Sequence, residues 1–393
     1  MASPRYTTPM TTRRDLLAFA ATSLAAPAFA ATPLPLTSAF PQKRAMLRLR
    51  STPPLLETPF ETFREGVFTP NDRFFVRWHY PFPTDVNPRA HRLRITGAVK
   101  RPLALSLADL ARLPRVQIAA VNQCAGNGRA LFAPRVPGAQ WGNGAMGNAL
   151  WEGVRLRDVL DLAGVTGKAV AVRASGLDQP ATEAPDFAKS LAIDHARDGE
   201  VMLAWAMNGE ALPLLNGFPL RLVVPGWYST YWVKMLDHLE VLDRPDDGYW
   251  MAKAYLGPVG DAADVAPGTS DFPKAPVGPM RPRAFITNVA AGARLPARPL
   301  LPLSGIAMGG DTGLRGVELS GDGGASWQPA QLGPDLGRYG FRRWQGAVPV
   351  RAGATNLMAR ANNANGLVQP LQQNWNPSGY TRWGVEPVPV EII

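Results

Sequence analysis

Cysteine is almost absent from this sequence, since Cys124 is the single one among 393 residues. A lone cysteine cannot form an internal disulfide, and it cannot supply the several thiolates that hold an iron–sulfur cluster. The attachment motif of a c-type haem, Cys-x-x-Cys-His, is also missing. We therefore expect no haem and no iron–sulfur cluster in this chain. Three roles are open to Cys124: a small buried hydrophobic residue, a metal ligand or a nucleophile.

Long apolar runs and strong charge are lacking as well. No stretch reaches the ~18 apolar residues that a membrane-spanning helix needs, so we expect no membrane span. Charged residues make up 18% of the chain, and 41 Lys and Arg against 31 Asp and Glu give a net charge of +10. These cations form no run of about five or more, and no nucleic-acid motif is recognisable, so we expect no nucleic-acid partner. A basic face could still attract an acidic macromolecule.

The composition that remains is that of a folded protein with more than one domain. A chain of 393 residues with 46% hydrophobic residues is too long for one ordinary core. Its 38 Gly and 39 Pro are spread along the chain, which is typical of short strands separated by turns and long loops.

The first 30 residues have the features of an export signal. Arg13 and Arg14 precede an apolar stretch that runs to about Ala26, and residues 28–30, Ala-Phe-Ala, fit a small-x-small cleavage site. Residues 1–30 are therefore predicted to be a twin-arginine signal that directs the chain to the periplasm, with a cytosolic amphipathic N-terminus as the alternative. This segment contains three Arg and one Asp, so the chain after it has a net charge of +8.

The rest of the sequence divides by composition and pattern. Residues 31–60 are rich in Pro and Thr and are expected to form an extended arm. Residues 61–260 mix helix and strand patterns, which predicts an α+β domain. Residues 261–282 are rich in Ala, Pro, Gly and Asp, as a linker would be. In residues 283–393 the helical pattern disappears and short strands follow one another between turns, which predicts a β-sandwich.

Local patterns place particular elements in the first domain. Ser106 and Asp109 form a capping box at the start of a short helix. A strand is expected over 117–123, with Cys124 at its end. Residues 156–163 show helical spacing and are followed by a glycine that suits a C-cap. Further short strands are expected at 169–174, 201–206, 220–224, 284–289, 314–319 and 356–361.

The densest functional motif is the segment 123–129, Gln-Cys-Ala-Gly-Asn-Gly-Arg. It places a soft thiolate at a strand end beside glycines, which let a bulky ligand approach the backbone, and Arg129 adds a positive charge. This segment resembles the cysteine motif of the sulfite oxidase family, whose members hold a molybdenum–pyranopterin through a cysteine. The resemblance implies that Cys124 is the metal ligand.

Further segments are similar to the same family: 73–79, 141–149, 216–226, 233–234 and 250–255 in the first domain, and 320–327 and 375–377 in the second. The resemblance implies a molybdenum–molybdopterin cofactor and an α+β molybdopterin domain followed by an immunoglobulin-like β-sandwich that forms a homodimer. Arg221 and Lys234, near a glycine-containing turn, suit the doubly charged phosphate of such a cofactor. Arg77 suits a sulfur oxyanion bound beside the metal.

The resemblance also implies a set of site residues. Those expected to bind the cofactor are His79, Cys124, Arg129, Asn216, Arg221 and Lys234. Those expected at the reacting centre are Arg77, Cys124, Tyr231 and Tyr255. Simpler roles remain open for some of them, because an arginine can lie on the surface, a histidine can be a satisfied core residue and a tyrosine can merely pack.

Two positions depart from the pattern of the family. Its sulfite-oxidising members carry an arginine shortly before the Val-Lys pair, where this chain has Tyr231. Loss of a cation weakens the binding of a dianion, which leaves the substrate more open than the cofactor. Asn216 likewise replaces a histidine, and its amide can still hydrogen-bond a phosphate.

The function predicted from the sequence is a periplasmic molybdenum oxidoreductase that oxidises sulfite to sulfate and passes electrons to an external c-type cytochrome. One alternative is a related molybdoenzyme that acts on sulfane sulfur with a cytochrome subunit, or on a sulfoxide-type substrate. The aromatic residues Trp227, Tyr228 and Trp232 favour it, because they could line a less charged pocket. Another alternative is a non-catalytic binding module, which the setting of Cys124 argues against.

Replacing both Arg13 and Arg14 by Lys is expected to abolish accumulation in the periplasm, because the arginine pair is the part of the signal that the export machinery reads. The measurement is the amount of the protein in periplasmic and cytoplasmic fractions. Unchanged periplasmic accumulation would show that the twin-arginine interpretation is wrong.

Overall fold

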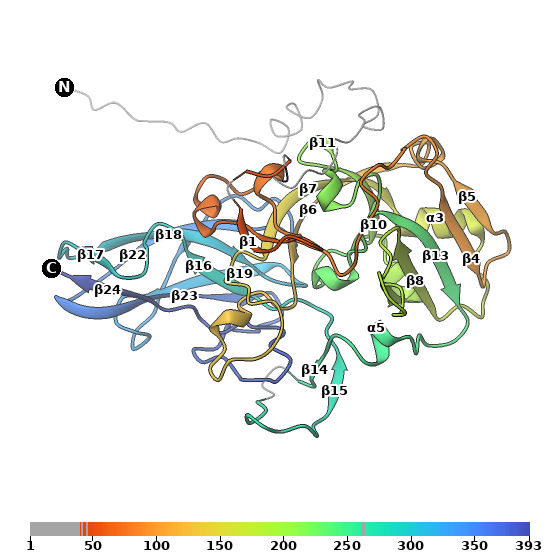
Figure 1. Ribbon diagram of the computed structural model, residues 1–393. Coiled ribbons are helices and arrows are strands. Elements are labelled where there is room, and N and C mark those ends of the chain that lie inside the picture. Colours follow the sequence, from red (N-terminus) through yellow and green to blue (C-terminus); the bar gives the residue numbers. More distant parts are fainter. Residues whose placement is uncertain (1–39, 41, 45, 261–263) are drawn as a thin grey trace, which may run out of the picture.

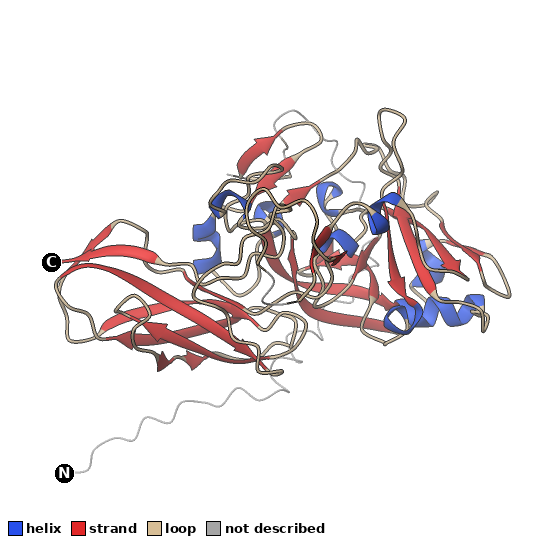
Figure 2. Ribbon diagram, turned by 90° about the horizontal axis from the view of Figure 1, so that it is seen from below, coloured by secondary structure: helices blue, strands red, loops and turns tan. Residues whose placement is uncertain are grey.

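The structure is a computed structural model that describes residues 40, 42–44, 46–260 and 264–393 (Figure 1). The predicted export signal lies outside the described residues. All the helices of the described part precede residue 253, and strands and loops make up the unit from β16 (Arg283–Ile286) to the C-terminus (Figure 2). None of these helices is long and apolar enough to cross a membrane.

A small sheet opens the N-terminal unit. Its strands are β1 (Leu47–Arg50), β2 (Leu55–Glu57) and β3 (Val76–Arg77), and the short 3-10 helices η2 (Phe60–Arg64) and η3 (Asn71–Arg73) lie between β2 and β3. Strands β2 and β3 pair antiparallel, with Leu55 opposite Arg77. This pairing positions Arg77 at the start of the segment that leads to His79.

The sheet that carries Cys124 is antiparallel, in the order β11-β10-β7-β6, with β12 also paired to β10. Its strands are β6 (Arg115–Gln123), β7 (Met146–Arg155), β10 (Met202–Met207), β11 (Glu210–Ala211) and β12 (Arg221–Val223). The β6–β7 register runs from Arg115 opposite Val154 to Gln123 opposite Met146. Both strands are almost wholly buried near this end, so Cys124 and the loop after it begin inside the protein.

A second sheet of the N-terminal unit has the order β5-β4-β13-β8-β9, in which only β4 and β13 are parallel. Its strands are β4 (Leu93–Gly97), β5 (Leu103–Leu105), β8 (Ala171–Gly176), β9 (Ala188–Ala192) and β13 (Leu236–Leu242). The helices of the unit are α2 (Leu107–Leu110), α3 (Leu156–Ala163), α4 (Ile193–Ala196) and α5 (Tyr249–Ala252), with 3-10 turns η4 (Arg129–Leu131), η5 (Leu214–Asn216) and η6 (Ser229–Tyr231).

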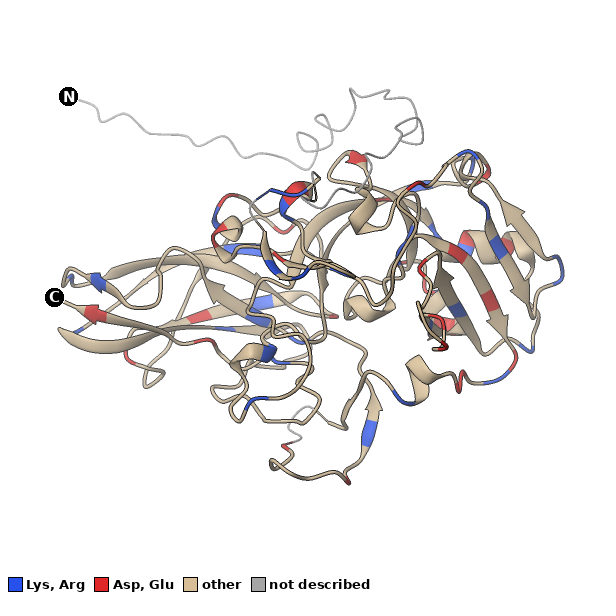
Figure 3. Cartoon of the chain, in the orientation of Figure 1, with Lys and Arg blue, Asp and Glu red and all other residues tan. Residues whose placement is uncertain are grey.

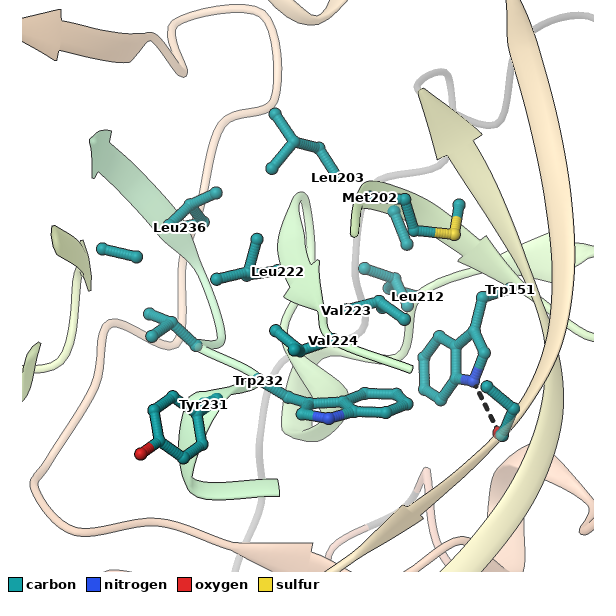
Figure 4. Close-up of a cluster of buried hydrophobic side chains, with 14 of the residues drawn as sticks. Trp151, Met202, Leu203, Leu212, Leu222, Val223, Val224, Tyr231, Trp232 and Leu236 are labelled. Atoms are coloured by element: carbon teal, nitrogen blue, oxygen red, sulfur yellow. Dashed lines mark hydrogen bonds between the residues drawn. The ribbon is translucent and has the colours of Figure 1, made fainter. Parts of the chain in front are cut away.

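One large hydrophobic core joins these elements. It contains Trp151 and Trp232, whose rings meet edge to face with centroids 5.5 Å apart, a geometry that aromatic pairs favour (Figure 4). The indole N–H of Trp151 donates to the carbonyl of Ala120 at 3.0 Å, so its polar atom is satisfied. The core therefore fixes β6, β7 and the segment of η6 against one another.

The C-terminal unit consists of two sheets packed face to face on a core of their own. The first sheet contains β16 (Arg283–Ile286), β18 (Leu301–Met308), β21 (Gln331–Leu332) and β22 (Arg342–Val348). The second contains β17 (Ala293–Leu295), β19 (Leu314–Ser320), β20 (Gln328–Pro329), β23 (Gly353–Asn363) and β24 (Val388–Ile392). The hairpin of β14 (Leu256–Pro258) and β15 (Lys274–Pro276) connects the units, so part of the expected linker forms a strand.

Several expectations from the sequence are confirmed. The capping box of Ser106 and Asp109 has both of its hydrogen bonds. The strand before Cys124 and the helix 156–163 are present, and Gly164 ends that helix with a left-handed φ of 69°. The expected mixture of helices and strands is confirmed too. An immunoglobulin-like, dimer-forming character of the C-terminal sheets stays a prediction.

Candidate active site

Cys124 lies at the end of β6, where two loops are joined by hydrogen bonds. Its side chain is 6% exposed, and its backbone N–H donates to the carbonyl of Ala145 at 2.9 Å. The N–H of Ala145 in turn donates to Oδ1 of Asn127 at 2.9 Å. Gly128 follows with a left-handed φ of 82°, and its N–H donates to the carbonyl of Gly142 at 2.7 Å. The cysteine is therefore held in a rigid loop pair.

Glu57 fixes the second of these loops. Its carboxylate accepts hydrogen bonds from the backbone N–H groups of Gly142 at 3.0 Å and Gly144 at 2.8 Å. Gly144 has no room for a side chain, since a Cβ there would lie 2.0 Å from the carbonyl oxygen of Thr58. The glycines of this loop thus allow β2 to approach the loop closely. The hydrogen bonds from Glu57 on β2 then fix the loop that contacts the cysteine loop.

An inner cleft opens beside Cys124. Three cations line it, Arg77, Arg221 and Lys234, and no Asp or Glu of the described residues does so. Its other polar lining residues are His79, Asn122, Asn216, Ser229, Thr230 and Tyr255. A cleft with this lining is electrostatically suited to an anion.

Several polar atoms around the cleft are buried without a partner in the protein. They are Nη1 of Arg77, Nδ2 of Asn122, Nε of Arg221 and Oγ1 of Thr230. Such burial costs free energy unless a ligand supplies the partners. No group of three or more His, Cys, Asp and Glu in the described part of the chain is placed to hold a metal ion, so a metal bound to Cys124 would need further ligands from a cofactor. A molybdenum–pterin with its phosphate fits this set of donors.

Two cations of the cleft, Arg221 and Lys234, have lowered pKa values. Burial lowers the pKa of Arg221 to about 9, while two of its nitrogens donate to the carbonyls of Asn216 at 2.8 Å and Trp232 at 3.2 Å. Burial also lowers the pKa of Lys234 to about 7; attraction to Asp178 opposes this shift, and repulsion from Arg221 and Arg77 adds to it. A bound dianion would reverse these shifts, because it favours the charged form of each group.

An outer cavity of about 780 Å³ lies next to the inner cleft, and the residues that line both spaces form a shared wall. Arg77, His79, Cys124 and Tyr255 line both the inner cleft and this cavity. Four cations line the outer cavity, Arg77, Arg129, Lys253 and Lys274, and again no Asp or Glu of the described chain does. The four shared residues therefore mark the place where a cofactor in the cleft would meet a substrate from the cavity.

His79 and Tyr255 form a linked pair at this wall. The His79 Nε2 and Tyr255 Oη atoms are 2.6 Å apart, a hydrogen bond between residues 176 positions apart in the chain. Burial, followed by the neighbouring cations, lowers the pKa of His79 well below its ordinary value, and burial raises the pKa of Tyr255. Both groups are therefore neutral near pH 7. Tyr255 also has a left-handed φ of 55°, a strain that non-glycine residues show mostly at functional sites.

The other residues expected from the sequence lie in different places. Asn216 lines the inner cleft, but its side-chain amide bonds Lys43 and the carbonyl of Phe75. Arg129 lines only the outer cavity, where it donates to Ser378 and lies 4.7 Å from the ring centroid of Tyr380. Tyr231 is buried and lines neither space. Their functional roles stay predictions.

Three residues near the site were not expected from the sequence. Lys43 donates to Oδ1 of Asn216 at 2.6 Å, and Glu57 holds the loop at Gly142. Lys189 on β9 lies 4.6 Å from the ring centroid of Tyr231. No motif surrounds these residues, and long-range contacts of this kind leave no local pattern by which they could have been found.

The chain is similar in sequence to proteins of known family. Residues 79–250 match the family described as an oxidoreductase molybdopterin binding domain. The chain is 33% identical to the mitochondrial sulfite oxidase of Drosophila melanogaster, over 90% of this chain and 64% of that protein, so it spans less than two thirds of that relative. It is 34% identical to the sulfite oxidase of Gallus gallus, over 87% of this chain and 78% of that protein.

A solved structure is similar over both units. The sulfane dehydrogenase SoxCD from Paracoccus pantotrophus superposes with a TM-score of 0.74 at 27% sequence identity, covering 97% of this chain and 96% of that chain. The arrangement of the two units is therefore shared with that protein.

Cys124→Ser is expected to fold but to lose metal and activity, because an alcohol is a poor replacement for a soft thiolate ligand. Thermal unfolding, elemental analysis and turnover measure the three properties. Ala130→Ser, which adds a hydroxyl on the exposed face of the neighbouring turn η4, is the matched control. Full metal content and activity in the Cys124 variant would contradict the assignment.

Proposed function

We propose, since this chain belongs to the sulfite oxidase family of molybdopterin oxidoreductases, that it oxidises an anionic sulfur compound, sulfite in the first place, and passes the electrons to an external c-type cytochrome. The observation that carries this proposal is the wall shared by the two spaces. The buried thiol of Cys124 lines both spaces. The inner cleft contains three cations and hydrogen-bond donors without partners in the protein, and the outer cavity is basic and connected to solvent.

The residues of the cleft divide the task of holding the cofactor. Cys124 would bind the metal, Arg221 and Lys234 would bind the phosphate, and Asn122 and Thr230 would bond the polar edges of the pterin. When bound, the cofactor supplies two-electron redox chemistry and exchange of an oxygen atom. The protein contributes binding, orientation and an electrostatic environment.

Arg77 is the residue best placed to bind the substrate. It lines both spaces, and its Nη1 is buried without a partner. A guanidinium there would bind an anionic substrate and stabilise negative charge as it redistributes in the transition state. The neutral His79–Tyr255 pair adds a fixed hydroxyl without adding negative charge that would repel the anion.

A second candidate is oxidation of a larger sulfur compound, such as one with sulfane sulfur. The outer cavity of about 780 Å³ is much larger than a sulfite ion, and Tyr231 replaces the arginine of the sulfite oxidisers. The similarity to a sulfane dehydrogenase supports the same alternative.

We further propose, from the sequence, that the protein is periplasmic and that its C-terminal unit is an immunoglobulin-like domain that forms a homodimer.

Arg77→Gln is expected to raise the KM for sulfite and to lower kcat, at a cost of ~3 kcal/mol or more in kcat/KM if the site excludes water. Steady-state kinetics with an artificial electron acceptor measure the effect apart from any partner. The control is Arg48→Gln, which removes an exposed arginine from the same small sheet. Unchanged sulfite kinetics in the Arg77 variant would mean that Arg77 does not bind the substrate or that sulfite is not the substrate.

The proposed electron acceptor, a c-type cytochrome, can be tested by the effect of salt concentration on the rate of its reduction. Lys, Arg, Asp and Glu are interspersed over both units (Figure 3), but the net charge of +8 that remains after the predicted export signal favours an acidic partner surface. The rate at which substrate-reduced enzyme reduces such a cytochrome should fall as salt shortens the Debye length below ~10 Å. Stopped-flow spectroscopy at several ionic strengths measures this rate. If an artificial acceptor is reduced and no c-type cytochrome is reduced at any salt concentration, the cytochrome proposal fails.

A further inference from the structure

Lys189 is a buried cation without an ion-pair partner among the residues that the structure describes. Its side chain projects from β9 and is 1% exposed. Its ammonium donates one hydrogen bond, to the carbonyl of Trp250 at 2.7 Å. The carboxylate that acts on it, Asp246, is paired with Arg173 at 2.7 Å. An ammonium has three N–H donors, so two remain unused by the contacts described.

The ammonium lies directly behind the wall of the active site. Its Nζ is 4.6 Å from the ring centroid of Tyr231 and 5.6 Å from that of Tyr255. Tyr255 lines both the inner cleft and the outer cavity, and its hydroxyl is bonded to His79. Lys189 is also among the cations that lower the pKa of His79, so its charge acts on a residue of the shared wall.

A buried ammonium in this position destabilises the folded chain. Removing a charge from water without a paired carboxylate costs free energy, and burial lowers the pKa of Lys189 to about 7. Cation–π contact with the two tyrosines offsets only part of such a cost. Strongly perturbed titratable groups of this kind cluster at functional sites, where a bound anion can supply the missing negative charge.

The residue at position 231 indicates what the charge of Lys189 does. This chain has an uncharged tyrosine there, and its ring centroid lies 4.6 Å from the ammonium of Lys189. Figure 4 shows the hydroxyl of Tyr231 directed away from the indole rings of Trp151 and Trp232. The uncharged side chain on η6 and the ammonium on β9 therefore lie side by side.

We infer that Lys189 supplies, from β9, the positive charge that the anion-binding site lacks at position 231, and that this pair of residues determines which anion the site prefers. The inference rests on the proposed function, because it takes the substrate to be an anion. Lys189 lines neither space, so it acts through its electric field across Tyr255 and not by contact with the substrate. It is a specificity-determining residue in this sense.

The test uses the holoenzyme, with sulfate as an unreactive anion and sulfite as substrate. Lys189→Met should weaken sulfate binding on the order of tenfold, as expected for loss of one partly screened charge, and raise the KM for sulfite more than it lowers kcat. Titration calorimetry measures the sulfate affinity independently of turnover. Lys168→Met, which removes an exposed lysine from a loop, should leave both values unchanged.

A charge-relocation variant separates this role from a structural one. Tyr231→Arg alone should not strengthen sulfate binding, because it adds a guanidinium beside Lys189 and like charges repel. The double variant Lys189→Met with Tyr231→Arg should recover the affinity that Lys189→Met loses. Lys189→Met should also unfold at a temperature no lower than the wild type, because an unpaired buried charge has been removed. Lys189→Gln, which can still donate to Trp250, serves the same test if the Met variant does not fold.

The inference and the function it rests on fail in different ways. Unchanged sulfate affinity in Lys189→Met, or a double variant that binds no better than it, would overturn the inference. So would a wild-type holoenzyme that binds no sulfate. A wild-type protein without molybdenum would instead overturn the proposed function.

Discussion

Three cations share one buried cleft, and they repel one another. Arg77, Arg221 and Lys234 line the space beside Cys124 without a carboxylate of the described chain among the lining residues. Burial lowers the pKa of Lys234 to about 7 although Asp178 attracts it, and repulsion from Arg221 and Arg77 adds to the shift, so the protein alone satisfies this charge poorly. A dianionic phosphate together with the polar edges of a pterin would satisfy them. The preference of this chain for its cofactor follows from that electrostatic requirement.

The rest of the structure holds this arrangement in place. The β6–β7 pair carries Cys124 to the cleft, and the core around Trp151 and Trp232 prevents the strands from moving. Glu57 holds the backbone at Gly142 and Gly144 from the opposite side. Fixed dipoles and charges of this kind need little reorganisation when a substrate reacts, and this is the main contribution a protein makes to chemistry that its cofactor performs.

The sequence predicts the local elements well and the long-range contacts poorly. The alternation and burial of residues before Cys124 are visible in a short window, and so is the capping box at Ser106, because each depends on neighbours in the chain. The contact of His79 with Tyr255 joins residues 176 positions apart, and only the resemblance to a family indicated that both belong to one site. Lys189 shows the limit, since nothing around it in the sequence distinguishes it from a surface lysine.

The account depends most on the claim that the cleft holds a molybdenum–pterin through its cations. The direct measurement is the molybdenum and pterin content per chain in the purified wild type, in Lys234→Met and in the exposed control Lys168→Met. Lys234 is half-buried with its ammonium 4.4 Å from the ring centroid of Trp78, and its charge interacts with the buried Asp178, so thermal unfolding of Lys234→Met is measured alongside its cofactor content. The account predicts about one molybdenum and one pterin per chain in the wild type and the control, and a large loss of both in a folded Lys234→Met protein. Full cofactor content in Lys234→Met, or none in the wild type, would contradict it.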